Sequence, residues 1–188
     1  SCRRGEVNEA VSIRNIKRYA AEHANNEMWK KNSKHLPSTG KKVCVVGGGP
    51  AGMTAAYYLA KQGHKTVLKE AMPKLGGQLQ YGIPSYRLPR EVVDREAGYL
   101  QDAGVKVETD CRVEDPKALL KEYDAVLMAI GTHMGVRLPM EGNDLPGALL
   151  NADFLQNAAM GKRTGMGKRV IVLGGGNVAF DCARTAVR

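Results

Sequence analysis

Two short apolar runs, each followed by glycines and then by a helical pattern, organise this chain of 188 residues. Residues 43–46 form a continuous, mostly β-branched run, as expected for a strand buried on both faces. The stretch "GGGPAGMTAAYYLA" that follows predicts a tight turn and a helix ending near Gly63, and residues 65–68 predict the next strand. A second run, "RVIVL" at 169–173, precedes "GGGNVAFDCARTAVR" and predicts another strand and helix. Alternating strands and helices indicate an α/β fold with a parallel sheet.

The rest of the chain separates these patterns into four predicted segments. The "SIRNIKRYAAEH" stretch predicts a helix with Ile13, Ile16 and Ala20 on one face and Ser12 as its N-cap. Residues 35–42 read as a linker because of their Pro, Ser and Gly content. The predicted segments are a helical part over 1–40, a Rossmann-like domain over 41–134, a connection over 135–167 with a short helix near 151–159, and the beginning of a second Rossmann-like domain over 168–188.

The first glycine motif has the spacing of a dinucleotide-binding loop. Gly47 permits the tight turn, Gly49 lets the backbone approach a pyrophosphate, and Gly52 lets the helix pack on the strand. Pro50 suits the first helical turn, and the helix N-terminus offers free N–H groups to the phosphates. Glu70, eighteen residues after Gly52, can accept hydrogen bonds from a ribose 2′-hydroxyl and would repel the 2′-phosphate of NADP.

Composition narrows the function classes. The formal charge is +9, with a net +6 in residues 1–42, but no basic run is interleaved with stacking aromatics, which argues against nucleic-acid binding. A solvated basic helix face and a docking surface for a partner subunit both fit this charge. No apolar run approaches the ~20 residues that span a bilayer, and nothing resembles a signal peptide. The four cysteines form no CxxC pair, so we expect a cytoplasmic protein without disulfides.

The residues after Glu70 distinguish FAD from NAD in the first site. The stretch "KLGGQLQYGIPSYRLPREVVDRE", 74–96, is too polar and too rich in Gly and Pro for a plain crossover helix. In flavoproteins with two dinucleotide folds, a GG pair at this place passes close to the flavin. The strand "YDAVLMAIGTH" ends in Gly131 and Thr132, which resembles the signature with which such proteins leave the first domain. The duplicated motif then predicts one site for FAD and another for the nicotinamide that reduces it.

The whole chain resembles the glutamate synthase small (β) subunit family, whose relatives include the flavin and NADPH domains of dihydropyrimidine dehydrogenase. The segments that carry the resemblance are "CRRGEVNEAVSIRNIKRYAAE", "LGGQLQYGIPSYRLPREVVDRE" and "GGGNVAFDCARTAVR". The resemblance implies an FAD-dependent oxidoreductase module that takes electrons from NAD(P)H and passes them to iron–sulfur clusters or a partner subunit.

The resemblance also implies roles for matching positions. Arg87 is expected near the flavin, whereas the residues alone favour a surface ion pair for it. The implied FAD contacts are Gly47, Gly49, Pro50, Ala51 and Gly52 at the pyrophosphate, Glu70 at the ribose, and Gly77, Gln78, Leu79, Arg87, Gly131 and Thr132 along the cofactor; the implied nicotinamide contacts are Gly174, Gly176, Asn177, Val178 and Ala179. Asp181 is expected in the first turn of the second helix, where an acid suits the helix dipole but does not help to bind phosphate.

The cysteines suggest how electrons leave the flavin. Disulfide reductases with two dinucleotide folds carry CxxxxC after the GG pair, and "GGQLQYGIP" contains no cysteine. Cys2, in "CRRGEV", matches the last cysteine of a cluster-binding series in the resembled family. A [4Fe–4S] cluster needs about four thiolates, so this chain cannot hold one alone. The alternative is an ordinary exposed cysteine near a terminus.

The activity is expected to need more chain than this sequence provides. No second strand follows the second helix, so we expect a fragment of a longer polypeptide that is inactive by itself, and NADH cannot be told from NADPH. No side chain has to act as an acid or base, because the flavin carries the chemistry. Two alternatives remain open: the C-terminal part of a flavin and iron–sulfur ene-reductase, and a non-catalytic module that binds a dinucleotide.

Overall fold

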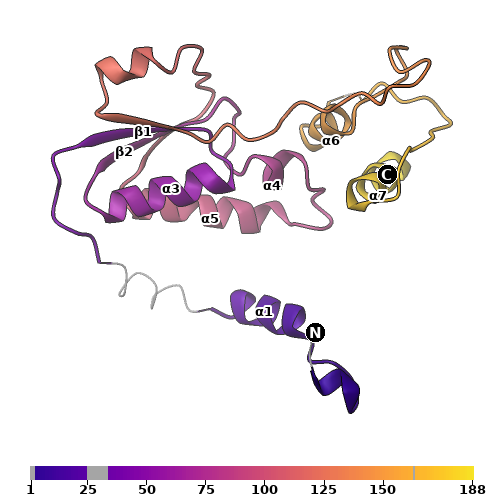
Figure 1. Ribbon diagram of the computed structural model, residues 1–188, viewed down its shortest axis with the longest axis horizontal. Coiled ribbons are helices and arrows are strands. Elements are labelled where there is room, and N and C mark those ends of the chain that lie inside the picture. Colours follow the sequence, from indigo (N-terminus) through magenta and orange to yellow (C-terminus); the bar gives the residue numbers. More distant parts are fainter. Residues whose placement is uncertain (1–2, 25–33, 163) are drawn as a thin grey trace. The chain divides into compact units, whose positions relative to one another are not determined.

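The structure is a computed structural model that describes residues 3–24, 34–162 and 164–188 (Figure 1). The chain forms two compact units, Ser1–Lys34 and His35–Arg188. In the first unit, the short 3-10 helix η1 spans Arg3–Glu6 and helix α1 spans Ile13–Glu22. Ser12 precedes α1 as predicted, although its hydroxyl accepts a hydrogen bond from the Asn15 side chain rather than capping the helix backbone. The predicted apolar face is exposed within this unit, with Ile13 and Ile16 each more than half accessible.

The second unit is built on a parallel sheet of four strands, and the predicted α/β class is confirmed. The strands are β1 (Lys42–Val46), β2 (Lys65–Lys69), β3 (Lys106–Glu108) and β4 (Ala125–Met128), in the order β3-β2-β1-β4. Every neighbouring pair is parallel, and Cys44 of β1 lies opposite Val67 of β2 and Val126 of β4. The chain crosses from β1 outward to β3 and then returns to β4 on the other side of β1. This reversal places the carboxyl ends of β1 and β4 next to each other.

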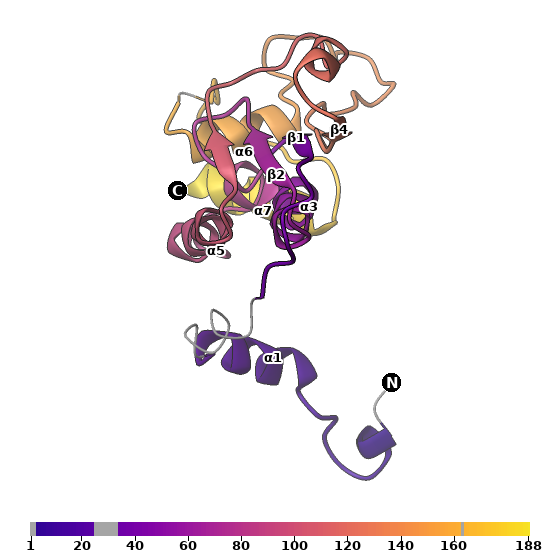
Figure 2. The ribbon, with the colours of Figure 1, turned by 90° about the vertical axis from the view of Figure 1, so that its left-hand side faces the viewer.

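Helices α3 (Pro50–Lys61) and α5 (Arg90–Asp102) lie side by side on one face of the sheet (Figures 1 and 2). Val45, Leu68 and Leu100 are almost completely buried between these layers, as continuous apolar strands require. The stretch 74–96 contains the one-turn helix α4 (Gln78–Tyr81) and the start of α5. The prediction that this stretch is not a plain crossover helix is therefore correct only up to Pro89. From Arg90 on, the residues "REVVDRE" form an amphipathic helix, whose charged face points to solvent while Val93 is buried.

Helix α3 ends where the sequence predicts. Gly63 has a φ of +86°, which only glycine adopts readily. The amide of Gly63 donates to the Ala60 carbonyl at 3.0 Å and the amide of His64 donates to the Leu59 carbonyl at 3.1 Å. This is the double hydrogen bond of a glycine-terminated helix, and it turns the chain directly into β2.

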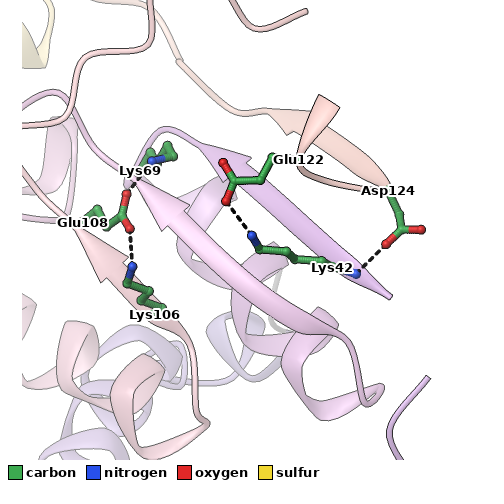
Figure 3. Close-up of polar contacts among 6 residues, drawn as sticks. All are labelled: Lys42, Lys69, Lys106, Glu108, Glu122 and Asp124. Atoms are coloured by element: carbon green, nitrogen blue, oxygen red, sulfur yellow. Dashed lines mark hydrogen bonds and ion pairs between the residues drawn. The ribbon is translucent and has the colours of Figure 1, made fainter. Parts of the chain in front are cut away.

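Ion pairs lie around the opposite face of the sheet, where Cys44, Val67 and Tyr123 form a smaller core under the 3-10 helix η2 (Ala118–Lys121). Figure 3 shows that Glu108 contacts both Lys69 and Lys106, the latter at 2.7 Å between Oε1 and Nζ. Lys42 pairs with Glu122 at 2.5 Å, and its backbone amide donates to the Asp124 carboxylate at 2.8 Å. Apart from Lys106–Glu108 within β3, these contacts join residues that are far apart in the sequence.

The C-terminal part contains α6 (Asn151–Ala159), as predicted, and α7 (Asn177–Val187). Phe154 and Leu155 of α6 pack against Cys182 of α7, and Val172 covers the edge of this cluster. The strand predicted over 169–173 is wrong for this structure: these residues form no ladder, and Ile171 and Leu173 are exposed. A parallel strand requires a neighbouring strand for its hydrogen bonds, and none of the four described strands pairs with this segment.

Candidate functional site: two glycine motifs and a buried carboxylate

The first glycine motif forms the sharp turn between β1 and α3. Gly47 has a φ of +107°, and a Cβ added there would lie 2.3 Å from the carbonyl oxygen of Ala129. A Cβ on Gly52 would lie 1.8 Å from the carbonyl oxygen of Gly47. The structure therefore gives Gly47 and Gly52 the turn and packing roles that the spacing predicts.

Gly49 is different, because the space in front of it is open. It is the N-cap of α3, with extended backbone angles (φ −75°, ψ −177°), and Pro50 is the first helical residue. A Cβ on Gly49 would have the Cα of Gly77 as its neighbour, at 3.8 Å. Pro50 and Ala51 are exposed at the first turn, where the N-terminal amides and the positive end of the helix dipole favour an anion. This arrangement fits the pyrophosphate of a dinucleotide.

The GG pair lies against this turn. The amide of Gly76 donates to the Gly48 carbonyl at 2.7 Å. Gly77 has a φ of +52°, and a Cβ on it would approach the Cα of Gly49 to 2.9 Å. The segment that the sequence assigns to the flavin is therefore in direct contact with the segment assigned to the pyrophosphate.

The end of β4 joins the same site. The side-chain Nε2 of Gln78 donates to the backbone carbonyl of Thr132 at 3.0 Å. Gly131, with a φ of +65°, turns the chain away from β4 directly before this contact. Leu79 is half-buried in α4, and its carbonyl accepts a hydrogen bond from Arg90 at 2.8 Å. Of the residues predicted along the first cofactor, Gly77, Gln78 and Thr132 thus gather at the carboxyl ends of β1 and β4, where ligands of open α/β sheets bind.

Glu70 is a buried carboxylate at the carboxyl end of β2, with only 8% of the residue accessible. Its Oε2 accepts a hydrogen bond from the Gly48 amide at 2.5 Å, and its Oε1 accepts one from the Met72 amide at 2.8 Å. A carboxylate has about four acceptor positions, so each oxygen can take a further hydrogen bond from a ribose hydroxyl. Gly48 and Met72 are neighbours of the predicted site that the motif spacing did not single out.

The second motif repeats the backbone of the first without its strand. Gly174 has a φ of +118°, close to that of Gly47, and Gly176 caps α7 with angles of −82° and 174°, close to those of Gly49. Ala179 stands where the first motif has Gly52, and a Cβ on Gly174 would lie 3.6 Å from its Cβ. Asn177 and Val178 begin α7 and are exposed. The turn can therefore present the α7 amides to a second dinucleotide.

Arg87 and Asp181 are brought together from the two motif regions. Arg87 Nη1 lies 2.6 Å from Asp181 Oδ2, and the Asp181 side chain is only 8% accessible. The hydrogen bond to Asp181 raises the pKa of Arg87 above its usual range. The ion pair that the residues alone favoured for Arg87 is present, and a contact of Arg87 with flavin stays a prediction. Asp181 is the fifth residue of α7 and lies beyond the first turn, so the sequence expectation for its position is wrong.

The described cysteines make no disulfide and no cluster site. Cys44 and Cys182 are buried, and loss of solvation raises the pKa of both thiols. Within residues 3–24, 34–162 and 164–188, no group of three His, Cys, Asp or Glu side chains could hold a metal ion. Cys2 lies outside the described residues, so its predicted role as a cluster ligand stays a prediction. None of the helices described is long and apolar enough to cross a membrane.

Comparison with known families decides what kind of protein carries this site. The family described as pyridine nucleotide-disulphide oxidoreductase matches residues 41–188. The chain belongs to this family. It is 39% identical to the NADPH-Fe(3+) oxidoreductase subunit beta of Geobacter sulfurreducens, over all of this chain and 29% of that protein. It is 36% identical to the NADPH glutamate synthase small chain of Escherichia coli K12, over all of this chain and 43% of that protein. The predicted resemblance to the glutamate synthase small subunit is therefore confirmed.

Solved structures agree on the fold. The FprA oxidoreductase of Mycobacterium tuberculosis in complex with NADPH superposes with a TM-score of 0.68 at 25% identity, over 79% of this chain and 36% of FprA. A 2-naphthoyl-CoA reductase superposes with a TM-score of 0.67 over 85% of this chain and 24% of that chain, but at 23% identity it supports the fold alone. This chain is thus a Rossmann-type oxidoreductase domain whose relatives include NADPH-dependent oxidoreductase subunits, and it spans less than half the length of the relatives described.

Proposed function

We propose that this chain holds the FAD site and the phosphate end of the NAD(P)H site of an oxidoreductase of the glutamate synthase small-chain type. The observation that carries the proposal is the contact of Gly77 with Gly49 beside the buried Glu70, together with a second motif of the same backbone conformation. The first group consists of the Glu70 carboxylate, the N-terminus of α3 and the Gly76–Gly77 pair, which meet at the carboxyl end of the sheet. This group fits FAD. The second motif, at the start of α7, fits a nicotinamide dinucleotide that delivers electrons.

When bound, FAD would supply the redox chemistry by accepting a hydride equivalent from NAD(P)H. The chain's own residues bind and orient. The α3 amides hold the pyrophosphate, Glu70 accepts from the ribose, and the Gly76–Gly77 turn keeps the segment beside the cofactor narrow. No described side chain is assigned an acid or base role.

Electrons leaving the flavin are proposed to pass one at a time to iron–sulfur clusters and then to a partner subunit or domain. The names of the relatives support this direction, since two of them are subunits or chains of larger assemblies. The absence of a CxxxxC motif after the GG pair in the sequence removes the thiol route. Cys2 is the proposed contribution of this chain to a [4Fe–4S] cluster whose other ligands come from elsewhere.

The test is an anaerobic titration of the full-length protein with NADPH and, separately, with NADH. We expect the visible absorbance of the oxidised flavin to bleach with one of the two in a stoichiometric titration, and iron and acid-labile sulfide to be present. A protein that purifies with flavin that neither dinucleotide reduces would show a non-catalytic binding module instead. A protein that purifies without flavin would refute the assignment of the first site.

A further inference from the structure

The loop that follows the GG pair is tied to the second motif by a compact polar cluster. Besides the 2.6 Å Arg87–Asp181 ion pair, the Tyr86 hydroxyl donates to the backbone carbonyl of Asp181 at 3.4 Å. The guanidinium groups of Arg184, in the last turn of α7, and of Arg188, the C-cap of that helix, lie 4.7 and 4.1 Å from the Tyr86 ring centroid. Cations at such distances over an aromatic ring are attracted to it. Two adjacent loop residues therefore contact two residues of α7 and its C-cap.

Both ends of this cluster lead to a predicted cofactor segment. On the loop side, Arg90 fixes the chain between α4 and α5, because Nη1 donates to the Leu79 carbonyl at 2.8 Å and Nη2 to the Ile83 carbonyl at 3.0 Å. Helix α4 starts directly after Gly77, which touches Gly49 of the first motif. The amide of Arg87 donates to the carbonyl of Pro84, the residue after Ile83, at 2.9 Å, so contacts run from the first motif to Arg87.

On the other side, Asp181 is about one helical turn from Asn177, the first residue of α7. A helix moves as a rigid element, so a displacement of Asp181 displaces the amides that follow Gly176 as well. The position of the second dinucleotide's phosphates is therefore mechanically linked to the loop at Arg87.

The energetics favour a defined geometry over a loose surface contact. The Asp181 side chain is 8% accessible while that of Arg87 is 44% accessible. A buried carboxylate is costly unless a charged partner and hydrogen bonds satisfy it, so Asp181 holds its guanidinium partner in place. The Lys74–Asp94 ion pair differs, because both of its side chains are about half accessible. Water can solvate this carboxylate, so Asp94 does not need its charged partner in a fixed position.

We propose that Arg87 and Asp181 are positioning residues that couple the two dinucleotide segments, and that their contact sets the alignment of nicotinamide and flavin. The proposal rests on the proposed function. Hydride transfer needs the reacting atoms near 3–3.5 Å apart and aligned, and a misplacement of about 1 Å can cost roughly 100-fold in rate. Holding α7 to the loop after the GG pair limits such misplacement without touching either reacting atom.

The test compares three variants of the full-length protein by anaerobic stopped-flow reduction with saturating NAD(P)H. Asp181→Asn keeps the shape of the side chain and removes its charge, and we expect flavin content to be unchanged while the limiting rate of flavin reduction falls about tenfold to a hundredfold. Asp181→Glu keeps the charge and should recover at least part of that rate. Asp94→Asn removes a carboxylate from the exposed Lys74 pair and should reduce at the wild-type rate.

The outcomes separate the coupling from the function beneath it. If NAD(P)H does not reduce the flavin of the wild-type protein, this result would overturn both the proposed function and the coupling. A wild-type protein that is reduced while Asp181→Asn is reduced equally fast would overturn the coupling alone. Loss of flavin from Asp181→Asn, or Asp181→Glu no faster than Asp181→Asn, would assign Asp181 to folding rather than to positioning and would also overturn it.

Discussion

The Glu70 carboxylate accepts a 2.5 Å hydrogen bond from the backbone amide of Gly48, the middle glycine of the first turn. A Cβ on Gly48 would lie 2.9 Å from Glu70 Oε2 and 2.4 Å from Leu75 Cδ2. The strand-end acid and the glycine turn are therefore a single structural unit, in which each fixes the other. The residue predicted to bind the ribose also shapes the loop predicted to bind the pyrophosphate.

We expect Glu70→Ala to weaken FAD retention by about 1.5–3 kcal/mol, the range for a hydrogen bond to a charged group. The change also leaves the Gly48 amide without its acceptor, so the free energy of unfolding should fall. Glu70→Gln keeps one acceptor oxygen and should retain more flavin than Glu70→Ala. The measurement is flavin content after dialysis of the full-length protein; equal content in wild type and both variants would remove Glu70 from the cofactor site.

Gly49→Val and Gly47→Ala should fail in different ways. A side chain on Gly49 enters space with no close neighbour except Gly77, so the protein should fold, but the branched side chain occupies the position where phosphate must approach. Gly47→Ala forces a φ of +107° on alanine and a contact of 2.3 Å with the Ala129 carbonyl oxygen, so it should destabilise the fold itself.

Circular dichroism and flavin absorbance on the two full-length variants separate these effects. We expect Gly49→Val to keep wild-type helix content without yellow colour, and Gly47→Ala to unfold at a lower urea concentration. A Gly49→Val protein that purifies with full flavin would contradict the pyrophosphate assignment.

Much of the first motif could be predicted from sequence because its signals are local. The β-branched run at 43–46, the glycine spacing and the stop at Gly63 each act within a few residues, and the strand, turn and helix form where they predict. The strand at 169–173 fails for the opposite reason. An apolar run indicates that a segment can be buried on both faces as a strand. The backbone hydrogen bonds of such a strand depend on a neighbouring strand, and the run carries no information about that neighbour.

The Arg87–Asp181 contact also lay beyond sequence reasoning. The two residues are 94 positions apart, and each alone resembles an ordinary surface charge. The local signal is an acid inside the largely apolar and small-residue stretch "NVAFDCA", and the sequence pattern alone relates this acid to the helix dipole. Burial of Asp181 against the loop at Tyr86 and Arg87 is a tertiary property, so only the structure shows it.

Cys2→Ser in the full-length protein should lower iron and acid-labile sulfide without removing FAD, because the residues proposed to contact FAD all lie within 47–132. Cys44→Ser is the control: this cysteine is fully buried in the sheet and contacts Val46, Val67 and Tyr123 rather than any metal site described. Iron quantification per flavin measures the difference. Equal iron in wild type and Cys2→Ser would return Cys2 to an ordinary terminal cysteine.

Glu108 should make the stability of the sheet depend on acid. Hydrogen bonds from Lys106 and Lys69 lower the pKa of Glu108 from its ordinary 4.5 to about 2. The folded-state pKa lies below the unfolded one, so the ionised carboxylate stabilises the fold above about pH 4.5, and this contribution is lost as the pH falls from there toward 2.

Glu108→Gln removes the charge at every pH. The urea midpoint of the variant should therefore be lower than that of wild type at pH 7, and the gap should narrow between pH 4.5 and the lowest pH at which wild type still folds. Glu114→Gln, which breaks an ion pair with Arg112 whose side chains are 79% and 76% accessible, should shift the midpoint little at any pH. A gap for Glu108→Gln that stays constant with pH would show that the side chain acts through packing and not through its charge.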